Sequence, residues 1–257
     1  MLRTIATWNV NSLRVRLPIL LDWLSRHPVD VIALQETKLP DEQFPRAEIE
    51  AAGYQVAFSG QRTYNGVAVL SKSPCTAALA DIPQFEDLQR RVLAVTTDGC
   101  RIVNLYVPNG QSVGSDKYEY KLRWFAAVTR WLAAEARAHP QLIVLGDFNI
   151  APEDRDVHDP KAWEGGVHVS PSERTALQGL LGEGFSDSFR LFEQPPDTYS
   201  WWDYRNVAFR RNHGLRIDLI LAHGSLATRC RSCVIDKEPR KLERPSDHAP
   251  VLASFDI

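Results

Sequence analysis

The feature that most constrains the fold of this chain is a set of short apolar segments that each meet a polar residue at one end. The segment LIVLGDFNIAP (142–152) has the aliphatic content of a buried strand, yet Asp147 and Asn149 follow the aliphatic run directly. Side chains two positions apart lie on the same side of an extended backbone. A carboxylate and a neutral amide can therefore face one ligand at the end of a core strand.

The same arrangement recurs along the chain. TIATWNVN, VIALQETK and IVNLYVPNG carry polar groups at the ends of strand-like runs, whereas GLRID and SDHAP carry them just before such runs. The residues concerned are Asn9, Glu36, Tyr106, Asn109, Asp218, Asp247 and His248. Ligands of α/β folds bind where strand ends meet. We therefore expect these side chains to form one site together with Asp147 and Asn149.

Strand-like and helix-like segments alternate throughout, which predicts layered α/β packing. Asp98-Gly99 between RVLAVTT and CRIVNLYV is typical of a β-hairpin turn, so part of the sheet is antiparallel. Leucines at helical spacing in residues 17–24 predict a helix that starts near Pro18, and residues 122–136 predict another. Ser170 to Glu173 read as the capping box of a third helix. No repeat or linker divides the chain, so we expect a single domain over residues 1–257.

Composition and charge exclude some classes of protein. Hydrophobic residues make up 44% of the chain and charged residues 24%, which is typical of a soluble globular protein. The net charge of −2 argues against a generic polyanion binder, so any contact with nucleic acid needs a local basic surface. The N-terminus lacks the pattern of a signal peptide, and no apolar run reaches the roughly 18 residues of a membrane span. We therefore expect a cytoplasmic protein with no membrane partner.

The four cysteines are consistent with a reducing compartment. Cys230 and Cys233 form a CRSC pair, the spacing of a redox motif or of half a zinc site. A second ligand pair is missing, and in an extended strand positions 230 and 233 face opposite ways. We interpret all four cysteines as structural.

The residue types at the expected site indicate metal-assisted chemistry. The carboxylates of Glu36, Asp147 and Asp247 repel one another unless a cation lies between them. Carboxylate and amide oxygens are hard ligands with no Cys or His cluster beside them, so Mg²⁺ or Mn²⁺ is favoured over zinc. His248, oriented by Asp218, can supply a positive or proton-donating group. This combination is typical of phosphate-ester hydrolysis.

Each motif by itself also has a simpler structural explanation. A single Asp at a strand end usually forms a turn or a cap, and a Ser-Asp-His triplet is usually an Asx turn. Tyr106 alone would be a half-buried aromatic residue of a strand. The joint placement of all these residues at strand ends favours a catalytic site over separate structural roles.

Eight motifs, in order and across nearly the whole chain, resemble those of the exonuclease III family of DNA-repair nucleases. These enzymes are also called apurinic/apyrimidinic endonucleases and belong to the endonuclease/exonuclease/phosphatase superfamily. The motifs are WNVNSLR, LQETK, YNGVAVLS, NLYVPNG, GDFNIAP, YSWWDYR, GLRIDLIL and RPSDHAP. The resemblance implies a four-layer α/β sandwich, with two mixed β-sheets packed face to face and helices outside. It also implies Mg²⁺-dependent phosphodiester hydrolysis at 3′ ends and at abasic sites of double-stranded DNA, and we expect a monomer.

The resemblance also implies a role for each site residue. Glu36 is similar to the principal metal carboxylate of the family, and Asp147 to the residue that positions or deprotonates the attacking water. Asn149 and Tyr106 match groups that hydrogen-bond the phosphate or the leaving oxygen, and Asp218 with His248 matches the pair whose imidazole contacts the phosphate. The expected metal ligands are Asn9, Glu36, Asp147, Asn149 and Asp247, and the expected catalytic residues are Tyr106, Asp147, Asn149, Asp218 and His248.

Residues 199–218 interleave aromatic and basic side chains, which suits a surface that holds phosphates and an unstacked sugar or base. Equally, the aromatic residues could be core and the arginines solvated. The resemblance assigns Trp201, Leu215 and Ile217 to an apolar pocket for a flipped abasic sugar. Further candidate DNA contacts are Asn109, Arg91, Lys121, Lys38 and Tyr64. The run KEPRKLER (237–244) alternates in sign, and we interpret it as a solvated face.

His168 lies just before the capping box of residues 170–173. In the family that the chain resembles, this position often carries a small or aliphatic residue near the bound DNA strand. An imidazole here is either a plain polar loop residue or a bulky group in the path of an uninterrupted strand. The second interpretation leads to the hypothesis that the enzyme processes 3′ ends more readily than it nicks internal abasic sites.

Two other functions use the same features. A superfamily phosphatase or phosphodiesterase acting on inositol phosphates, lipids or RNA tails would share the catalytic residues, but the aromatic and basic segment 199–218 favours DNA. A DNA-binding protein without catalysis should have lost at least one site residue, and every family position considered is filled.

Overall fold

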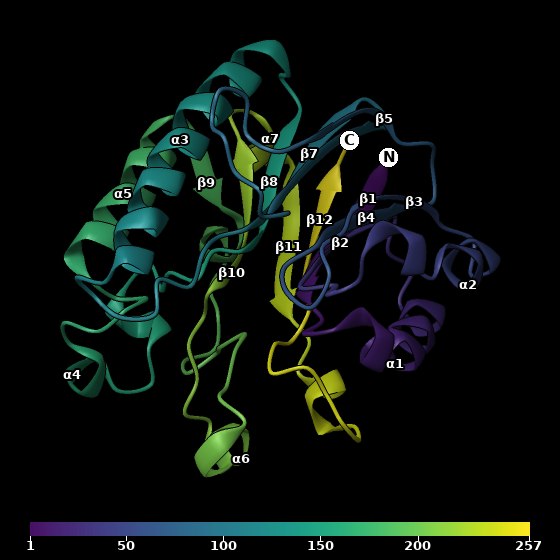
Figure 1. The fold of residues 1–257 in the computed structure, drawn as a ribbon. Helices are drawn as coiled ribbons and strands as arrows, with labels where there is room; N and C mark the ends of the chain where they lie inside the picture. The colour runs from purple at the N-terminus through teal and green to yellow at the C-terminus, as the bar shows by residue number, and fades with distance from the viewer.

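Two six-stranded sheets lie face to face in the computed structural model, which describes all 257 residues (Figure 1). The first sheet has the order β11 (Cys230–Ile235), β12 (Val251–Asp256), β1 (Leu2–Asn9), β2 (Val31–Gln35), β4 (Val67–Ser71) and β3 (Gln55–Ser59). The second has the order β5 (Thr76–Ala80), β6 (Val92–Thr97), β7 (Cys100–Tyr106), β8 (Leu142–Asp147), β10 (Asp218–His223) and β9 (Phe185–Asp187).

Each sheet is mixed, with a single parallel pair among antiparallel neighbours. β1 pairs in parallel with β2, and β7 with β8. Within each pair the C-terminal ends of the two strands therefore lie side by side, Asn9 opposite Gln35 and Tyr106 opposite Asp147. The predicted hairpin is confirmed, because Thr97 of β6 pairs with Cys100 of β7. Its turn residues Asp98 and Gly99 have φ values of 47° and 75°, the left-handed conformation that a tight hairpin turn needs.

Helices cover the outer faces of the two sheets (Figure 1). The helices are α1 (Leu13–Arg26), α2 (Arg46–Ala51), α3 (Asp116–Ala138), α4 (Pro160–Trp163), α5 (Pro171–Gly182), α6 (Ala208–Arg211) and α7 (Leu226–Arg229). Short 3₁₀ turns are η1 (Asp41–Gln43), η2 (Asp154–Asp156), η3 (Ser188–Leu191), η4 (Arg205–Val207) and η5 (Glu238–Lys241). No helix combines the length and the apolar content that crossing a bilayer would require.

Three large apolar clusters account for the layers. Trp23 of α1 and Ile49 of α2 pack on the outer face of the first sheet. Phe125 of α3 and Leu177 of α5 pack on the outer face of the second sheet. A further cluster, which includes Ile143 of β8, fills the space between the sheets. The predicted four-layer α/β sandwich is therefore confirmed.

Two local expectations need correction. Helix α1 begins at Leu13 rather than near Pro18, which lies inside the helix. Its start is set by the loop after β2, because the N–H of Leu13 donates to the Thr37 carbonyl at 3.0 Å. That contact satisfies an amide group that helix starts otherwise leave unpaired.

The second correction concerns the CRSC pair in β11. A β-bulge shifts the register between Cys230 and Ser232, so the extra residue turns both thiols toward the core. Cys230 and Cys233 are 6% and 2% exposed. Burial raises the pKa of both thiols, which makes them poor nucleophiles. Cys230 and Cys233 therefore face the same side of β11, and the expectation that they face opposite sides was wrong. All four cysteines are free.

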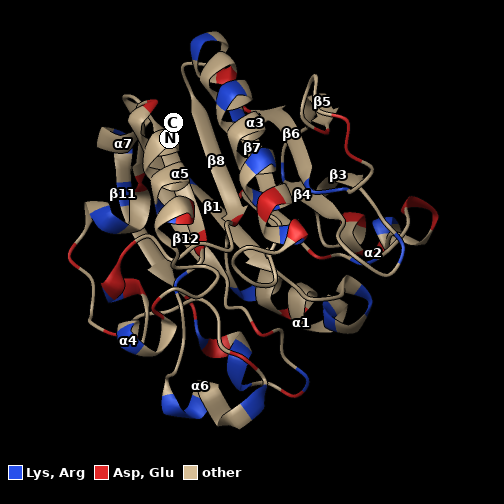
Figure 2. Cartoon of the chain, turned by 60° about the vertical axis from the view of Figure 1, so that its left-hand side comes forward, with Lys and Arg blue, Asp and Glu red and all other residues tan.

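One segment projects away from the layers, and we call residues 203–213 the exposed arm. It contains η4 and α6, and it lies at the bottom of Figure 1, below the sheets. In Figure 2 the ribbon of α6 is blue at its basic residues, which are Arg210 and Arg211. The Arg205 side chain is 83% exposed, and Tyr204 and Val207 are each 50% exposed. The arm is therefore a local basic surface on a chain whose net charge is slightly negative.

Candidate active site

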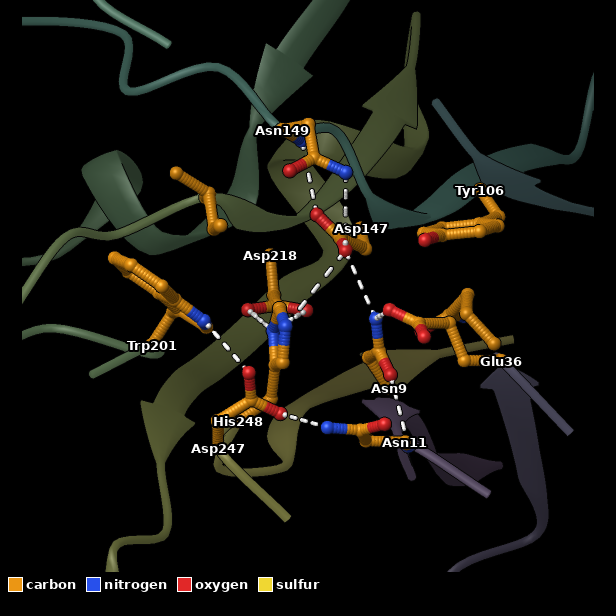
Figure 3. A network of polar contacts seen from close by, with 12 residues as sticks. Asn9, Asn11, Glu36, Tyr106, Asp147, Asn149, Trp201, Asp218, Asp247 and His248 are labelled. Atoms are coloured by element: carbon orange, nitrogen blue, oxygen red, sulfur yellow. Dashed lines mark hydrogen bonds and ion pairs between the residues drawn. The ribbon is translucent and has the colours of Figure 1, made fainter. Parts of the chain in front are cut away.

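The strand ends bring the predicted catalytic residues together (Figure 3). The first sheet and its loops supply Asn9, Glu36 and His248, and the second sheet supplies Tyr106, Asp147 and Asp218. Asp218 opens β10 directly opposite Asp147, the last residue of β8, in the antiparallel register. The site therefore lies across both sheets, at the edge where β1, β2, β7 and β8 end.

Asn9 joins two acids that come from different sheets. Its Nδ2 donates to Oε1 of Glu36 at 2.8 Å and to Oδ2 of Asp147 at 2.9 Å. The backbone N–H of Asn11 donates to Oδ1 of Asn9 at 2.9 Å, which keeps the amide in this orientation. Lys38 Nζ lies 2.8 Å from the other oxygen of Glu36. Glu36 has a φ of 53°, an uncommon backbone conformation that is often found at functional sites.

His248 is held by Asp218 and faces Asp147. Its Nδ1 lies 2.9 Å from Oδ2 of Asp218, and its Nε2 lies 3.8 Å from Oδ2 of Asp147. Ser200 Oγ donates to the same Asp218 oxygen at 2.6 Å, which fixes the carboxylate. All four side chains are buried, so the pair keeps one orientation toward Asp147.

The electrostatics of this cluster place one positive group beside one acid of intermediate strength. Burial alone would lower the pKa of His248, but Asp218 and Asp147 outweigh burial and raise that pKa to about 10. Burial raises the pKa of Asp147 to about 7, although His248 opposes the shift. At neutral pH His248 is therefore an imidazolium, while Asp147 can take up or release a proton.

Asn149 completes the support of Asp147. Its backbone N–H donates to Oδ1 of Asp147 at 2.9 Å, and its Nδ2 donates to the Val107 carbonyl at 2.9 Å. Asn149 has a φ of 50°, which turns the chain sharply after β8. Its Oδ1 accepts a weak hydrogen bond from Asn109 at 3.4 Å. The amides of the two asparagines thus lie side by side at the edge of the site.

Tyr106 lies on the opposite side of Asp147 from His248 (Figure 3). Its ring lies 4.6 Å from the guanidinium of Arg91, which also donates to the Tyr106 carbonyl at 3.2 Å. Burial, with a further contribution from Glu36, raises the pKa of Tyr106 well above its usual value. The hydroxyl therefore stays protonated and can donate a hydrogen bond.

The cluster has the donors of a divalent-cation site. Glu36, Asp147 and His248 each offer a ligand atom, and these atoms lie within 4.8 Å of one another. Because His248 is engaged by Asp218 and is protonated, the two carboxylates are the natural donors. Oxygen donors suit hard cations such as Mg²⁺ and Mn²⁺.

Asp247 lies beside these donors rather than among them. Its Oδ1 accepts from Asn11 Nδ2 at 2.9 Å, and its Oδ2 accepts from Trp201 Nε1 at 3.0 Å. Each carboxylate oxygen therefore already has a donor. The role of Asp247 as a metal ligand stays a prediction.

The residues expected to form the sugar pocket differ in accessibility. Trp201 is partly exposed, whereas Leu215 and Ile217 are 0% and 2% exposed. These two pack in a small apolar cluster under Trp201 and Trp163. The rings of Trp163 and Trp201 meet edge to face at 6.5 Å. The surface open to a ligand is therefore formed by the two tryptophans, and Leu215 and Ile217 support it from below.

Lys121 is not at the surface, as a DNA contact would require. Its side chain is 1% exposed and forms a buried ion pair with Glu173 of α5. Its Nζ also donates to the carbonyls of Asn149 at 2.7 Å and Asn109 at 3.1 Å. The expected contact with DNA phosphate is thereby corrected, because all three donors of the ammonium are used inside the protein. Lys121 instead holds the ends of two active-site loops.

Tyr64, Arg91 and Asn109 line one groove next to the catalytic cluster. Its volume is about 810 Å³, and its other walls include Lys117 and Tyr120 of α3. Tyr64 is 68% exposed, whereas Arg91 is 9% exposed and bonded to Gln89. The groove adjoins the catalytic cluster at Asn109, which contacts Asn149, so it can receive part of an extended substrate.

His168 is buried beside the site rather than projecting from the loop. It is 5% exposed, and its ring packs within 6.1 Å of Trp163 and 6.4 Å of Trp201. Its Nδ1 lies 2.7 Å from the Asn149 carbonyl, which can only accept, so Nδ1 carries the proton. Burial and the nearby Lys121 lower the pKa of His168 to about 4, so the ring is neutral.

Several supporting residues escaped the sequence analysis. Ser200, Ser246, Glu173, Trp163 and Arg240 orient or cover the catalytic cluster without touching its centre. Ser200 and Ser246 stand inside the motifs YSWWDYR and RPSDHAP, and Glu173 was expected only as part of a helix capping box. Trp163 lies in a loop, and nothing in its local sequence indicates which residues it will contact.

The sandwich and its acid-and-imidazole edge together define a class of phosphoester hydrolases. Residues 6–248 match the Endonuclease/Exonuclease/phosphatase family. Exodeoxyribonuclease III of Haemophilus influenzae is 36% identical over 262 residues, covering 97% of this chain and 98% of the relative. An exodeoxyribonuclease of Bacillus subtilis is 32% identical over 257 residues and covers 98% of both chains. The chain belongs to this family, in its exonuclease III group.

Two solved structures are similar over nearly the whole length. The 3′-5′ exonuclease NExo of Neisseria meningitidis has a TM-score of 0.97 and 45% identity, covering 99% of this chain and 100% of that one. An AP endonuclease of Archaeoglobus fulgidus has a TM-score of 0.96 and 36% identity with the same coverage. NExo from Neisseria is also described as a 3′ phosphatase in a structure bound to a product DNA hairpin.

Proposed function

We propose that this protein is a metal-dependent DNA-repair nuclease that hydrolyses phosphodiesters at the 3′ ends of double-stranded DNA. It would act as a 3′–5′ exonuclease and 3′-phosphatase, with Mg²⁺ as cofactor. The observation that carries the proposal is the pairing of Asp147, whose pKa is about 7, with the His248 imidazolium 3.8 Å away. The Asp147 carboxylate, which can accept a proton, therefore lies next to the His248 imidazolium, which can face a phosphate.

In the proposed mechanism Asp147 orients the attacking water and takes up its proton, since its pKa is close to the working pH. His248, kept positive by Asp218, stabilises the charge that develops on the phosphate. Tyr106 donates a hydrogen bond to the phosphate or the leaving oxygen, and Asn149, which bonds Asp147 through its backbone N–H and Nδ2, would turn its amide from Asp147 to donate a second one. A divalent cation held by Glu36 and Asp147 would polarise a phosphate oxygen and offset negative charge.

Two observations favour DNA over a smaller phosphate ester. The exposed arm carries Arg210 and Arg211, both exposed, beside an Arg205 that is paired with Asp203, so it offers cations to a phosphate backbone. Trp163 and Trp201 form a partly open aromatic surface close to the catalytic edge, which suits an unstacked base or sugar. The central apolar cluster shared by both sheets supports one domain over residues 1–257, and we expect it to act as a monomer.

Three end-labelled duplexes compared in Mg²⁺ test this function. One carries a 3′-phosphate, one a recessed 3′-hydroxyl and one an internal abasic site. We expect the first two to be processed and Glu36→Gln to lose the activity at low Mg²⁺. Release of phosphate from inositol or lipid substrates, with all three duplexes left intact, would replace the nuclease by a phosphatase of the same family.

Within this function, we propose that His168 limits cleavage at internal abasic sites. The neutral ring fills the corner between Trp163 and Trp201, where a sugar turned out of a continuous strand would have to enter. His168→Gly should raise abasic-site cleavage and leave 3′-end removal nearly unchanged. Glycine is compatible with the backbone here, because His168 has a φ of 76°. A wild-type enzyme that nicks abasic duplexes as fast as it trims ends would contradict the idea.

A further inference from the structure

Arg240 differs from its neighbours in the run KEPRKLER. Lys241, Glu243 and Arg244 are exposed, as expected for a solvated face, but Arg240 is only 6% exposed. Its guanidinium carbon lies 4.8 Å from the ring centre of Phe209 and 5.7 Å from that of Tyr204. Both aromatic residues belong to the exposed arm. The interpretation of this run as solvated is therefore wrong at position 240, which is packed against the base of the arm.

The other side of Arg240 meets the segment that carries His248. Its Nη1 donates to the Ser246 carbonyl. Ser246 Oγ in turn donates to the Asn9 carbonyl at 2.6 Å and accepts the N–H of His248 at 3.2 Å. Ser246 thus connects Arg240 to His248, which carries the imidazolium, and to Asn9, whose side-chain amide joins the two acids.

A second tie links the same two regions. Tyr204 Oη donates to the Pro245 carbonyl at 2.8 Å and accepts from Arg16 at 2.8 Å. Arg16 also donates to the Asn11 carbonyl at 2.8 Å. Next to Arg240, the N–H of Trp202 donates to the Asp247 carbonyl at 3.0 Å. The base of the arm and residues 245–248 are therefore packed as one unit.

We propose that Arg240 is a positioning residue that couples the exposed arm to the segment 246–248. DNA held by the arm then sets the position of His248 through the guanidinium. The idea rests on the proposed nuclease function. A planar guanidinium is suited to this task because it can stack on aromatic rings and donate in its own plane at the same time. Small displacements of a catalytic group lower turnover without lowering affinity in proportion.

Three variants separate positioning from DNA contact and from folding. Arg240→Met keeps the apolar packing on Phe209 but removes the donor to Ser246. We expect kcat on a 3′-phosphate duplex to fall on the order of 10–100-fold, as for other groups that orient a ligand, with KM changed less than about threefold. Lys241→Met, an adjacent exposed cation, should match the wild type. Arg240→Lys keeps a donor with poorer stacking and should recover part of kcat.

Amide hydrogen exchange in the free protein gives a readout that does not depend on cleavage. Arg240→Met should raise exchange at Trp202, His248 and Ala249 and leave β8 unchanged. Unchanged exchange at these amides overturns the proposal, as does a raised KM with normal kcat, or a lower Tm with normal kcat. If the wild type cleaves no DNA, the nuclease function fails, while the exchange data still decide whether Arg240 holds the segment.

Discussion

Asp147 is surrounded by hydrogen-bond donors that favour its ionised form. The amide of Asn9, the backbone N–H of Asn149 and, farther away, Nε2 of His248 all face its carboxylate. Burial acts in the opposite direction and is the larger effect, which raises the pKa to about 7. The same residue can therefore hold a proton briefly and give it up again near neutral pH.

Asp147→Asn keeps the shape of this side chain and removes its charge. We expect turnover to fall on the order of 10²–10⁴-fold, the usual contribution of a general base or an electrostatic group. DNA affinity should stay close to that of the wild type, because the arm and the groove are unaltered. Single-turnover kinetics with saturating enzyme measure the first quantity, and filter binding measures the second. Normal turnover with weakened binding would remove Asp147 from the catalytic group.

The positive charge of His248 should also make the stability of the protein depend on pH. Its pKa rises from about 6.5 in the unfolded chain to about 10 in the folded protein, despite burial, because of Asp218 and Asp147. The charged pair therefore stabilises the fold fully below about pH 6.5, and the contribution is lost as pH rises toward 10. We expect the difference in Tm between wild type and His248→Asn to be larger at about pH 6 than at about pH 10. A constant difference would mean that His248 is not charged in the folded protein.

The position of some site residues could be predicted from the sequence, and that of others could not. Asp147 and Asn149 could be placed together in advance because period-two alternation is a property of the local backbone. Lys121 could not be placed, because its sequence neighbours in α3 include both exposed and buried side chains. Whether a lysine is solvated depends on a partner far along the chain, here Glu173. Such pairs become visible only when the helices have packed.

Helices α3 and α5 meet at that pair, which acts as a support for three loops. Besides the bonds of Lys121 to Asn109 and Asn149, Glu173 accepts the backbone N–H of His168 at 3.0 Å. Glu173 is also the third residue of the helix in the capping box with Ser170, as the sequence predicted. One buried carboxylate thus caps the start of α5 and fixes the segment between α4 and α5.

Lys121→Met should weaken both the fold and the chemistry. It leaves the Glu173 carboxylate buried without its partner, which typically costs about 3–5 kcal/mol of unfolding free energy. The double variant Lys121→Met/Glu173→Gln should regain part of that stability but not the activity, because the carbonyls of Asn109 and Asn149 still lack their donor. Urea unfolding and kcat on the same preparations test this. Activity that recovers together with stability would show that the pair matters for folding alone.

Secondary structure was predictable where the signal is local. Asp98-Gly99 favours one turn type by its backbone preference, and Ser170 with Glu173 favours one helix start. The start of α1 could not be predicted from the local sequence, because it is set by the Thr37 carbonyl in the loop that follows β2. The bulge at Cys230 is equally non-local, since it exists only relative to β12. Boundaries set by tertiary contacts cannot be read from one segment.

For the molecule as a whole, a divalent cation should add stability as well as activity. A ligand that binds only the folded state raises Tm in proportion to the logarithm of its concentration once its sites are saturated. We expect Mg²⁺ to raise Tm and chelation to abolish cleavage, since the site then lacks the cation that would polarise the phosphate beside Glu36 and Asp147. Glu36→Gln should reduce the shift in Tm and raise the Mg²⁺ needed for cleavage. Undiminished cleavage in excess chelator would exclude this mechanism.

The four-layer arrangement itself could be predicted from the alternating strand-like and helix-like segments together with the family motifs. The pairing order within each sheet could not, because β12 at the C-terminal end lies between β11 and β1. That order depends on which strand ends fit together once the core between the sheets has formed. It also brings His248 close to Asn9, since Ser246 Oγ bonds to both residues although 238 residues lie between them in the sequence.

The division of the catalytic residues between the two sheets has a consequence for a cell that makes this protein. Asn9, Glu36 and His248 belong to one sheet, and Tyr106, Asp147 and Asp218 to the other. Asn9 can join Glu36 to Asp147, and Asp218 can hold His248, only when residues of both sheets are in contact. A nascent or partly unfolded chain therefore lacks a complete catalytic site and should not cleave DNA. Cleavage begins only when the sheets have docked, so the appearance of activity during refolding reports that final step.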